Sequence, residues 1–364
     1  MKILIILPND SLGGAEQYLK MVASYFKKCT VEVFFLQKSN KNGWGKSDEF
    51  IQLNYPEFNN KILSIIKFIS HPKHKNTKNY DYIFTSHVYT TGLIGIMLRL
   101  GLIRSSNFIA RESTSIFIRF KGLKLISYKL FYWLGYKKVD LLICQTKFMK
   151  DQLVKGFPGL ENSTNIKVIP NPIDYSLIKA KEKLVSHEEL PENFIVSAGR
   201  LINEKGYDIL INAFSKLKTN FPSLKLVILG EGNLREELSN QVTTLNLQNE
   251  VILKGFVENV YPYFKSAKAC VVSSRVEGFP NVLLQMMSQN SNVVSTTCAG
   301  GISEIPGIHI SDTHNVNSLL NAITAALKST TDNSILFDGY LNKRDISYFM
   351  AQINDNLNND KKNN

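Results

Sequence analysis

The stretch from Ser273 to Gln285 combines a carboxylate, a glycine and a helix start. The apolar, β-branched run 269–273 leads into it and predicts a buried parallel strand. Gly278 permits a tight turn, and Pro280 suits the first position of a helix, where its missing N–H is no loss. The next amides would be unpaired donors at the positive end of a helix and would favour a pyrophosphate. They belong to Asn281, Val282 and Leu283.

Two side chains of this stretch suit neutral hydroxyl groups. A carboxylate beside an anion site would repel phosphate, so we expect Glu277 to accept hydrogen bonds from a sugar. Gln285 follows about a turn and a half into the helix, and its amide both donates and accepts. The alternative is a plain strand-loop-helix connection with a surface glutamate. The first interpretation predicts a sugar-nucleotide site.

The same stretch resembles the E-G-x-P-x-x-x-x-E signature of the family 4 retaining glycosyltransferases. The chain matches at Glu277, Gly278 and Pro280, and departs at Gln285, where the family has a second glutamate that holds the nucleotide ribose. Glutamine keeps the reach but loses a charge-assisted bond, which weakens nucleotide affinity by about 1 kcal/mol. The resemblance implies an α/β fold of two Rossmann-like domains facing a cleft, the GT-B architecture.

A second motif supplies cations. The residues from Gly199 to Gly206 resemble the family pattern G-R-L-x-x-x-K-G. An arginine grips a diphosphate with two parallel hydrogen bonds and a lysine adds a point charge, so Arg200 and Lys205 are predicted to bind the donor pyrophosphate. The alternative is a surface ion pair with a neighbouring acidic residue. With Glu277, these two residues form the predicted catalytic set.

Three glycine loops complete the donor side of the resemblance. Gly14 lies in a segment like the family's G-G-x-E loop, whose second glycine approaches the donor phosphate. Gly230 and Gly255 lie in segments like the family loops that line the nucleotide pocket. Each loop alone could be a plain turn. The resemblance covers roughly residues 2–310, and its motifs are specific only in combination.

The acceptor side has weaker candidates. Arg111 and Glu112 resemble an R-E element that some family members carry where others have a histidine, so either could contact the acceptor or the donor sugar. A helix-capping role is equally open for them. His87 also follows a predicted strand and could face the cleft, although a lone histidine is more often structural.

The length and composition predict two domains. The chain has 364 residues with 44% hydrophobic content, which is enough for two full cores. Short apolar strands alternate with helical stretches, which indicates parallel sheets with helices on both faces. The expected strands are 2–7, 31–36, 82–85, 107–110, 141–145, 167–169, 194–198, 225–229, 251–253, 269–273 and 292–295.

The domain boundary is expected where this alternation stops. Two prolines interrupt residues 169–174, and a polar, charged linker follows over 179–192. We therefore predict an N-terminal, acceptor-side domain at 1–175 and a C-terminal, nucleotide-sugar domain at 190–340. Residues 341–364 would form a C-terminal helix and a tail that is disordered from Asn356.

Sequence features also bear on location. The four cysteines are scattered singly, which favours buried thiols in a reducing compartment over disulfides or metal ligands. The N-terminal apolar run ends at Pro8 and predicts a strand rather than a signal peptide. No stretch reaches the roughly 18 apolar residues of a spanning helix. We expect a cytoplasmic protein, peripheral on the inner face of the membrane.

The net charge of +12 lies entirely in the first half of the chain. Residues 1–175 hold 25 basic and 12 acidic residues, and the segment 119–138 alternates lysines with large aromatic side chains. Such a segment is typical of a helix lying on anionic lipid. The alternative is an ordinary amphipathic helix with a solvated basic face. Nucleic-acid binding is not favoured, because no recognition motif accompanies the charge.

These observations predict a retaining glycosyltransferase that moves a sugar from a nucleotide donor, such as a UDP-sugar, to a glycan or polyprenyl-linked acceptor in surface polysaccharide assembly. No two aspartates are two residues apart, so a D-x-D metal site is not expected, and neither is any cofactor. One alternative is a catalytically inactive sugar-nucleotide-binding subunit, which only Gln285 favours. Another is a GT-B-type epimerase, which would turn over without an acceptor.

Overall fold

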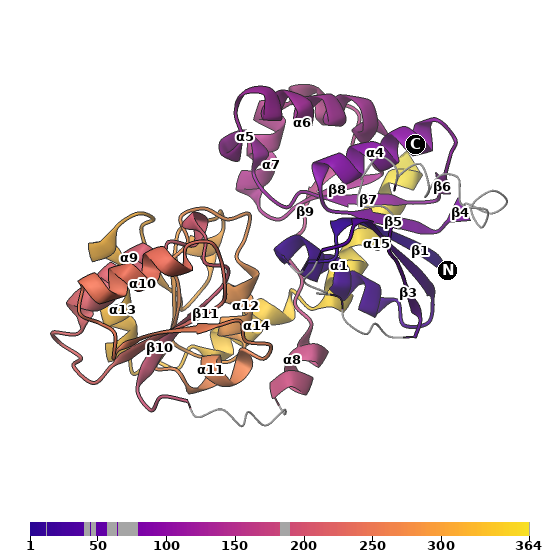
Figure 1. Ribbon diagram of the computed structural model, residues 1–364. Coiled ribbons are helices and arrows are strands. Elements are labelled where there is room, and N and C mark those ends of the chain that lie inside the picture. The colour runs from indigo at the N-terminus through magenta and orange to yellow at the C-terminus, as the bar shows by residue number, and fades with distance from the viewer. Residues whose placement is uncertain are drawn as a thin grey trace. The chain divides into compact units, whose positions relative to one another are not determined.

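The computed structural model describes residues 1–363 except 12, 40–43, 45–48, 57–63, 65–78 and 183–189. The chain forms two compact units (Figure 1), one of Met1–Pro172 with Ile346–Asn364 and the other of Ile173–Asp345. The chain therefore leaves the first unit once and returns to it once. At the base of the second unit, the N–H of Ile173 donates to the carbonyl oxygen of Arg344 at 2.7 Å.

The first unit is built on a parallel sheet of seven strands in the order β3-β2-β1-β5-β7-β8-β9. Its strands are β1 (Lys2–Asn9), β2 (Thr30–Gln37), β3 (Ile51–Asn54), β5 (Tyr82–Thr85), β7 (Phe108–Arg111), β8 (Leu141–Cys144) and β9 (Ile166–Val168). A separate two-stranded pair consists of β4 (Asn79–Tyr80) and β6 (Arg104–Ser105). The helices are α1 (Gly14–Tyr25), α4 (Val88–Arg99), α5 (Ile116–Arg119), α6 (Gly122–Gly135), α7 (Lys147–Gly156) and α15 (Ile346–Asn363), with 3-10 turns η1 (Tyr136–Lys138) and η2 (Pro158–Leu160).

Helices cover this sheet on both faces, as its apolar pattern requires. Along β1, Ile3, Ile5 and Leu7 enter the core on one face, whereas Leu4 and Ile6 enter the core on the other. The first of these cores takes side chains from α1 and α15, and the second takes side chains from α4, α6 and α7. Both faces of a parallel sheet must be covered because side chains of successive residues point to opposite sides.

The second unit has a parallel sheet of six strands in the order β12-β11-β10-β13-β14-β15. They are β10 (Phe194–Ala198), β11 (Lys225–Leu229), β12 (Val251–Gly255), β13 (Ala269–Val272), β14 (Val293–Thr296) and β15 (His309–Ser311). The helices are α8 (Tyr175–Glu182), α9 (Tyr207–Leu217), α10 (Arg235–Thr244), α11 (Tyr261–Ser266), α12 (Asn281–Met287), α13 (Val316–Lys328) and α14 (Ser334–Asn342), with 3-10 turns η3 (Asn203–Lys205) and η4 (Ile302–Glu304).

The strand order of each sheet reverses at one point. The reversal falls between β1 and β5 in the first unit and between β10 and β13 in the second. Loops that leave adjacent parallel strands in opposite directions open a crevice at their carboxyl ends, where ligands of such folds bind. Both units are therefore Rossmann-like, as the sequence predicted, and each has one preferred place for a site.

Three features differ from the sequence-based expectation. The short strands β3 and β15 were not predicted, and α8 includes residues 179–182, the start of the expected linker. The tail is helical to Asn363 rather than disordered from Asn356, because Leu357 is buried in the core of the first unit. The C-terminal helix thus belongs to the N-terminal unit and not to a third segment.

The cysteines behave as the sequence predicted. All four are free thiols, and Cys144, Cys270 and Cys298 are buried. Burial raises the pKa of Cys298 to about 12, so its thiol stays protonated at neutral pH. Among the described residues, no helix combines the length and the hydropathy needed to cross a membrane.

Candidate functional site

The second unit brings Lys205 and Glu277 together at its strand-order reversal. Lys205 ends η3 in the loop after β10, and Glu277 lies in the loop after β13. The Lys205 Nζ donates to Glu277 Oε1 at 2.5 Å, and both side chains are 18% exposed. The sequence placed these residues 72 positions apart, so their contact supports one site made from two motifs.

The carboxylate of Glu277 is held from several directions. Its Oε1 also accepts from the Ser274 hydroxyl at 2.9 Å, and its backbone N–H donates to the Cys298 carbonyl at 2.8 Å. A ligand with a diphosphate and a sugar can take over both halves of the ion pair, because lysine binds phosphate and the carboxylate accepts from hydroxyls. In this structure the two side chains satisfy each other, and together they form the candidate site for such a ligand.

Arg200 is the other predicted cation. It is exposed in the loop after β10, and its guanidinium has no hydrogen-bond or ion-pair partner in the described part of the chain. The neighbouring ion pair expected as an alternative is thus not formed. An unengaged guanidinium beside Lys205 suits a flexible ligand that brings its own negative charge.

Gly230 and Gly255 form a tight backbone contact rather than a plain turn. The Gly230 N–H donates to the Gly255 carbonyl at 2.7 Å, and a Cβ on Gly230 would lie 1.9 Å from the Gly199 oxygen. Gly230 (φ 140°) and Gly255 (φ 88°) also have backbone angles that favour glycine. Next to them, the Phe256 ring is 80% exposed. No role was predicted for this ring from the sequence.

The helix start after Glu277 differs in detail from the expectation. Gly278 does not adopt a positive φ, so its turn does not need glycine, and Pro280 is the residue before the helix rather than its first. The Leu283 N–H donates to the Pro280 carbonyl at 3.0 Å, so this amide is not the free donor that was predicted. Asn281 and Val282 open α12 and are partly exposed.

Gln285, one turn into α12, has a specific partner. Its Nε2 lies 3.5 Å from the Tyr261 hydroxyl, which α11 contributes. Burial raises the pKa of Tyr261 to about 12, so the phenol keeps its proton. The side chain at the second signature position is thus neutral and faces a neutral hydroxyl. A ribose would meet an amide there instead of a carboxylate.

In the first unit, His87 pairs with Glu16 across the strand-order reversal. His87 precedes α4 in the loop after β5, and its Nε2 lies 3.1 Å from Oε1 of Glu16 in α1. The other carboxylate oxygen accepts from the Gly13 N–H at 3.0 Å, next to Gly14. Burial opposes ionisation, but bonds from His87 and the backbone outweigh it and lower the Glu16 pKa. Glu16 was missed, although it completes the G-G-x-E pattern.

Arg111 and Glu112 are buried, which changes their expected role. The Arg111 Nη2 donates to Asn171 at 2.5 Å, and its guanidinium lies over the Tyr18 ring, 4.5 Å from the centroid. Glu112 accepts from the Tyr136 hydroxyl at 3.1 Å, and burial raises its pKa to about 7. Neither side chain is exposed to an acceptor in this structure. Both residues therefore pack inside the first unit and are not exposed at the carboxyl ends of its strands.

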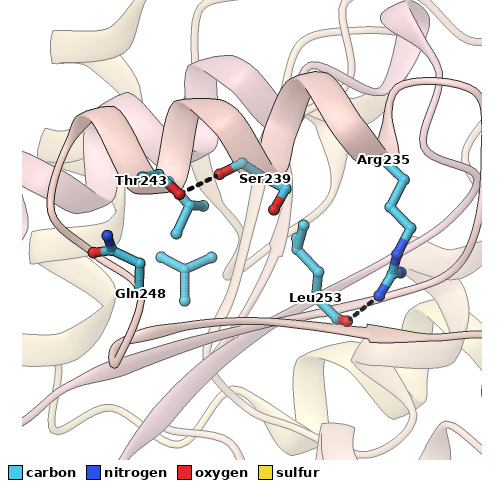
Figure 2. Close-up of a pocket in the computed structure, with 7 residues that line it drawn as sticks. Arg235, Ser239, Thr243, Gln248 and Leu253 are labelled. Atoms are coloured by element: carbon cyan, nitrogen blue, oxygen red, sulfur yellow. Dashed lines mark hydrogen bonds between the residues drawn. The ribbon is translucent and has the colours of Figure 1, made fainter.

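Figure 2 shows a pocket that is separate from these residues. It has a volume of about 230 Å³ and lies between α10 and β12. The lining residues are Arg235, Ser239, Val242, Thr243, Gln248, Val251 and Leu253. None of the predicted site residues lines it, so we place the candidate site at the Lys205–Glu277 pair.

Comparison with known proteins identifies the family of the chain. The model of the glycosyl transferases group 1 matches residues 179–336, and the model of glycosyltransferase family 4 matches residues 12–177. A Campylobacter jejuni N-acetylgalactosaminyltransferase acting on a diphospho-undecaprenol-linked disaccharide is 30% identical over 94% of this chain and 93% of its own length. The chain belongs to the family 4 glycosyltransferases.

Other relatives agree with the family. An uncharacterized glycosyltransferase from Methanocaldococcus jannaschii is 35% identical over 52% of this chain and 47% of its own length. Among solved structures, Anabaena HepE in complex with UDP and glucose has a TM-score of 0.78 at 20% identity and covers 99% of this chain and 100% of its own. This glycosyltransferase therefore has the GT-B fold, and it is an enzyme of the hexosyltransferase class.

Proposed function

We propose that this glycosyltransferase transfers a sugar from a UDP-sugar to a polyprenyl-linked glycan, with retention at the anomeric carbon, during surface polysaccharide assembly. The observation that carries the proposal is the Lys205–Glu277 pair at the strand-order reversal of the second unit. The Campylobacter relative's undecaprenol-linked acceptor supports the acceptor class, and the UDP complex of HepE supports the nucleotide.

The order of the loops along the sheet predicts which way the bound donor runs across it. Carboxyl ends of β12, β11, β10 and β13 follow one another across the sheet. They present, in turn, Phe256, the Gly230 loop, the two cations and Glu277. A nucleotide sugar has a matching order, with the base at one end, the diphosphate in the middle and the sugar at the other end. The phenyl ring offers a stacking surface for the base, and Glu277 accepts from the sugar hydroxyls.

The residues of the second unit can lower the barrier by electrostatics and positioning. As the sugar–oxygen bond breaks, negative charge grows on the leaving diphosphate, and Arg200 and Lys205 stabilise it. No nucleophile is assigned on the opposite face of the sugar, so retention implies a same-face displacement. The acceptor oxygen bonds to the anomeric carbon on the face that the diphosphate leaves, and the leaving diphosphate takes the acceptor proton. No metal is required by this scheme, so we expect EDTA to leave transfer unchanged.

His87 is the remaining acceptor-side candidate. Its partner Glu16 fixes one ring nitrogen at 3.1 Å, beside the Gly13–Gly14 loop. Arg111 and Glu112 act on the acceptor only indirectly, since both are buried.

Transfer assays test the proposal. The full-length protein is incubated with a panel of UDP-sugars and an undecaprenyl-diphosphate-linked glycan, alongside Glu277→Ala and Gln285→Glu. Turnover in the wild type that Glu277→Ala abolishes is the expected result. If every form binds UDP but none transfers a sugar, the chain is a catalytically inactive binding subunit instead, and Gln285→Glu shows whether the glutamine is the reason.

An exposed apolar surface on α6 supports a lipid-linked acceptor. Leu123, Ile126, Leu130 and Trp133 are spaced along one side of this helix, and Leu123 is 85% exposed. Lysines flank them at 121, 124, 129, 137 and 138, all exposed. Apolar side chains with a basic border fit an anionic lipid surface.

The opposite side of α6 is fixed to the unit. A Cβ on Gly95 of α4 would lie 1.9 Å from the Gly135 oxygen, so the two helices touch backbone to backbone. Figure 1 shows α6 lying along α4. The apolar surface of α6 therefore faces away from the unit. We propose that it seats the enzyme peripherally on the cytoplasmic face of the membrane.

Sedimentation with anionic vesicles tests this seat. Substituting Leu123, Ile126 and Trp133 by serine should remove binding, and removing the lysines at 121, 124, 137 and 138 should abolish its salt dependence. The control is Ile335→Ser, which removes an equally exposed apolar residue (82%) from α14 in the other unit. Binding that survives the α6 substitutions rules this surface out.

A further inference from the structure

Arg275 is bonded to the chain on both sides of Lys205. Its Nη1 donates to the Asn203 carbonyl at 2.6 Å, and its backbone N–H donates to the Glu204 carbonyl at 2.7 Å. Beyond Lys205, its Nη2 pairs with Asp208 Oδ2 at 2.6 Å. Arg275, in the loop after β13, therefore contacts the loop after β10 on both sides of Lys205.

The two loops also touch through their backbones. The Ser273 hydroxyl donates to the carbonyl oxygen of Lys205 at 2.9 Å. Gly206 has φ 64°, and a Cβ there would lie 2.3 Å from the Ser273 oxygen. Only glycine fits this approach, so the turn after Lys205 is pressed against the strand end that leads to Glu277.

Such anchoring matters because lysine is flexible. Its long side chain has many rotamers, so a useful position for Nζ depends on a fixed backbone beneath it. The Arg275 side chain is 16% exposed, and its contacts satisfy a carbonyl and a carboxylate at once. A planar guanidinium can donate hydrogen bonds in two fixed directions at once, whereas an ammonium group acts as a single point charge.

We propose that Arg275 is a positioning residue that holds the Lys205 loop in register with Glu277, so that diphosphate and sugar are met by one rigid site. Arg275 itself touches neither part of the donor. The inference rests on the donor site described under Proposed function and deepens it by naming what keeps its two halves together.

Binding of UDP, measured by calorimetry on the full-length protein, gives the first test. Arg275→Gln should weaken UDP binding by about tenfold and donor kcat/KM by more, because a misplaced charge is lost both in binding and in the transition state. Arg275→Lys should recover part of the loss, since it keeps the pairing with Asp208. Asp208→Asn should weaken UDP binding by a smaller factor.

A matched control comes from Lys218, which lies near the amino ends of the strands of the same sheet, whereas Lys205 lies at their carboxyl ends. Its ammonium also bonds a carbonyl, that of Pro222, and pairs with Glu250 at 3.6 Å. Lys218→Gln should leave UDP binding within about twofold of the wild type. A comparable loss in this variant would show that any broken ion pair in the unit has the effect, and would overturn a special role for Arg275.

A double-mutant cycle separates positioning from general stability. In a Lys205→Met background there is no ammonium left to position, so Arg275→Gln should reduce UDP binding by less than about twofold. If the two losses multiply instead, Arg275 acts independently of Lys205 and the inference is wrong. Melting temperatures of all variants are compared to confirm that each is folded.

The outcomes for the two proposals differ. If the wild type binds no UDP or other nucleotide diphosphate, the donor site fails, and the Arg275 inference fails with it. If the wild type binds UDP and Arg275→Gln binds it equally well, only the positioning role fails.

Discussion

At the scale of single residues, the ion pair between Lys205 and Glu277 makes opposite predictions for its two members. Glu277→Gln releases Lys205 for the diphosphate, so UDP should bind about threefold tighter while sugar transfer is lost. Lys205→Met should weaken UDP by about tenfold, because it removes the phosphate ligand. Calorimetry with UDP measures both. If Glu277→Gln bound UDP more weakly than the wild type, the Glu277 carboxylate would not compete with the diphosphate for Lys205.

Glu112 gives a prediction of pH dependence. Burial raises its folded-state pKa from the ordinary glutamate value of 4.5 to about 7, so the folded state favours the protonated form. Stability from this group is present below the lower value and is lost as pH rises through the higher one. Relative to Glu112→Gln, the wild type should lose about 2 kcal/mol between pH 5.5 and 8. Urea unfolding of both proteins at the two pH values measures this. An equal change in the free energy of unfolding of the two proteins would refute it.

The sequence identified the chemistry of these residues but not their surroundings. Arg200, Lys205 and Glu277 were found from charge, glycine spacing and the family signature. The burial of Glu112 and the pairing of Glu16 with His87 depend on which helices pack behind the sheet, and no local pattern encodes that. Gln285 stood out by its type, whereas its Tyr261 partner lies 24 residues away.

At the scale of elements, apolar runs predicted the long strands because β-branched residues cluster where both faces are covered. The expected bounds of 82–85, 194–198 and 225–229 agree with β5, β10 and β11. The strands β3 and β15 were missed because they are short edge strands with polar residues. The predicted donor residues Lys205 and Glu277 follow β10 and β13, the two strands on either side of the reversal, because both motifs come directly after apolar runs.

The glycine contact between β10 and β11 gives a prediction at this scale. Gly230→Ala would place a Cβ 1.9 Å from the Gly199 oxygen at a φ of 140°, so the two loops must separate. We expect a loss of about 2 kcal/mol of stability and much weaker UDP binding. The control is Gly339→Ala in α14, where a Cβ meets nothing within 4 Å. That variant should gain about 0.5–1 kcal/mol from helix propensity. Equal effects of the two substitutions would contradict a special close approach at Gly230.

At the scale of the whole molecule, each unit has its own two apolar core clusters among the described residues. The sequence predicted two Rossmann-like domains from composition and alternation, and that prediction is correct. It did not reveal that α15 returns to the first unit. This return depends on a packing partner more than 300 residues away, and helical periodicity alone names no partner.

The returning helix gives the last prediction. Phe349 of α15 is 2% exposed, packs in the core of the first unit and lies with its ring 5.6 Å from that of Tyr18. Phe349→Ala should cost about 3 kcal/mol, because it empties a core site, whereas Tyr348→Ala on the exposed side should cost less than about 0.5 kcal/mol. Since the second unit has its own core, UDP should still bind to Phe349→Ala below its melting temperature. Unfolding should then separate into two transitions, of which UDP raises only the later one. A single transition that UDP shifts as a whole would show that the units unfold together and that α15 couples them.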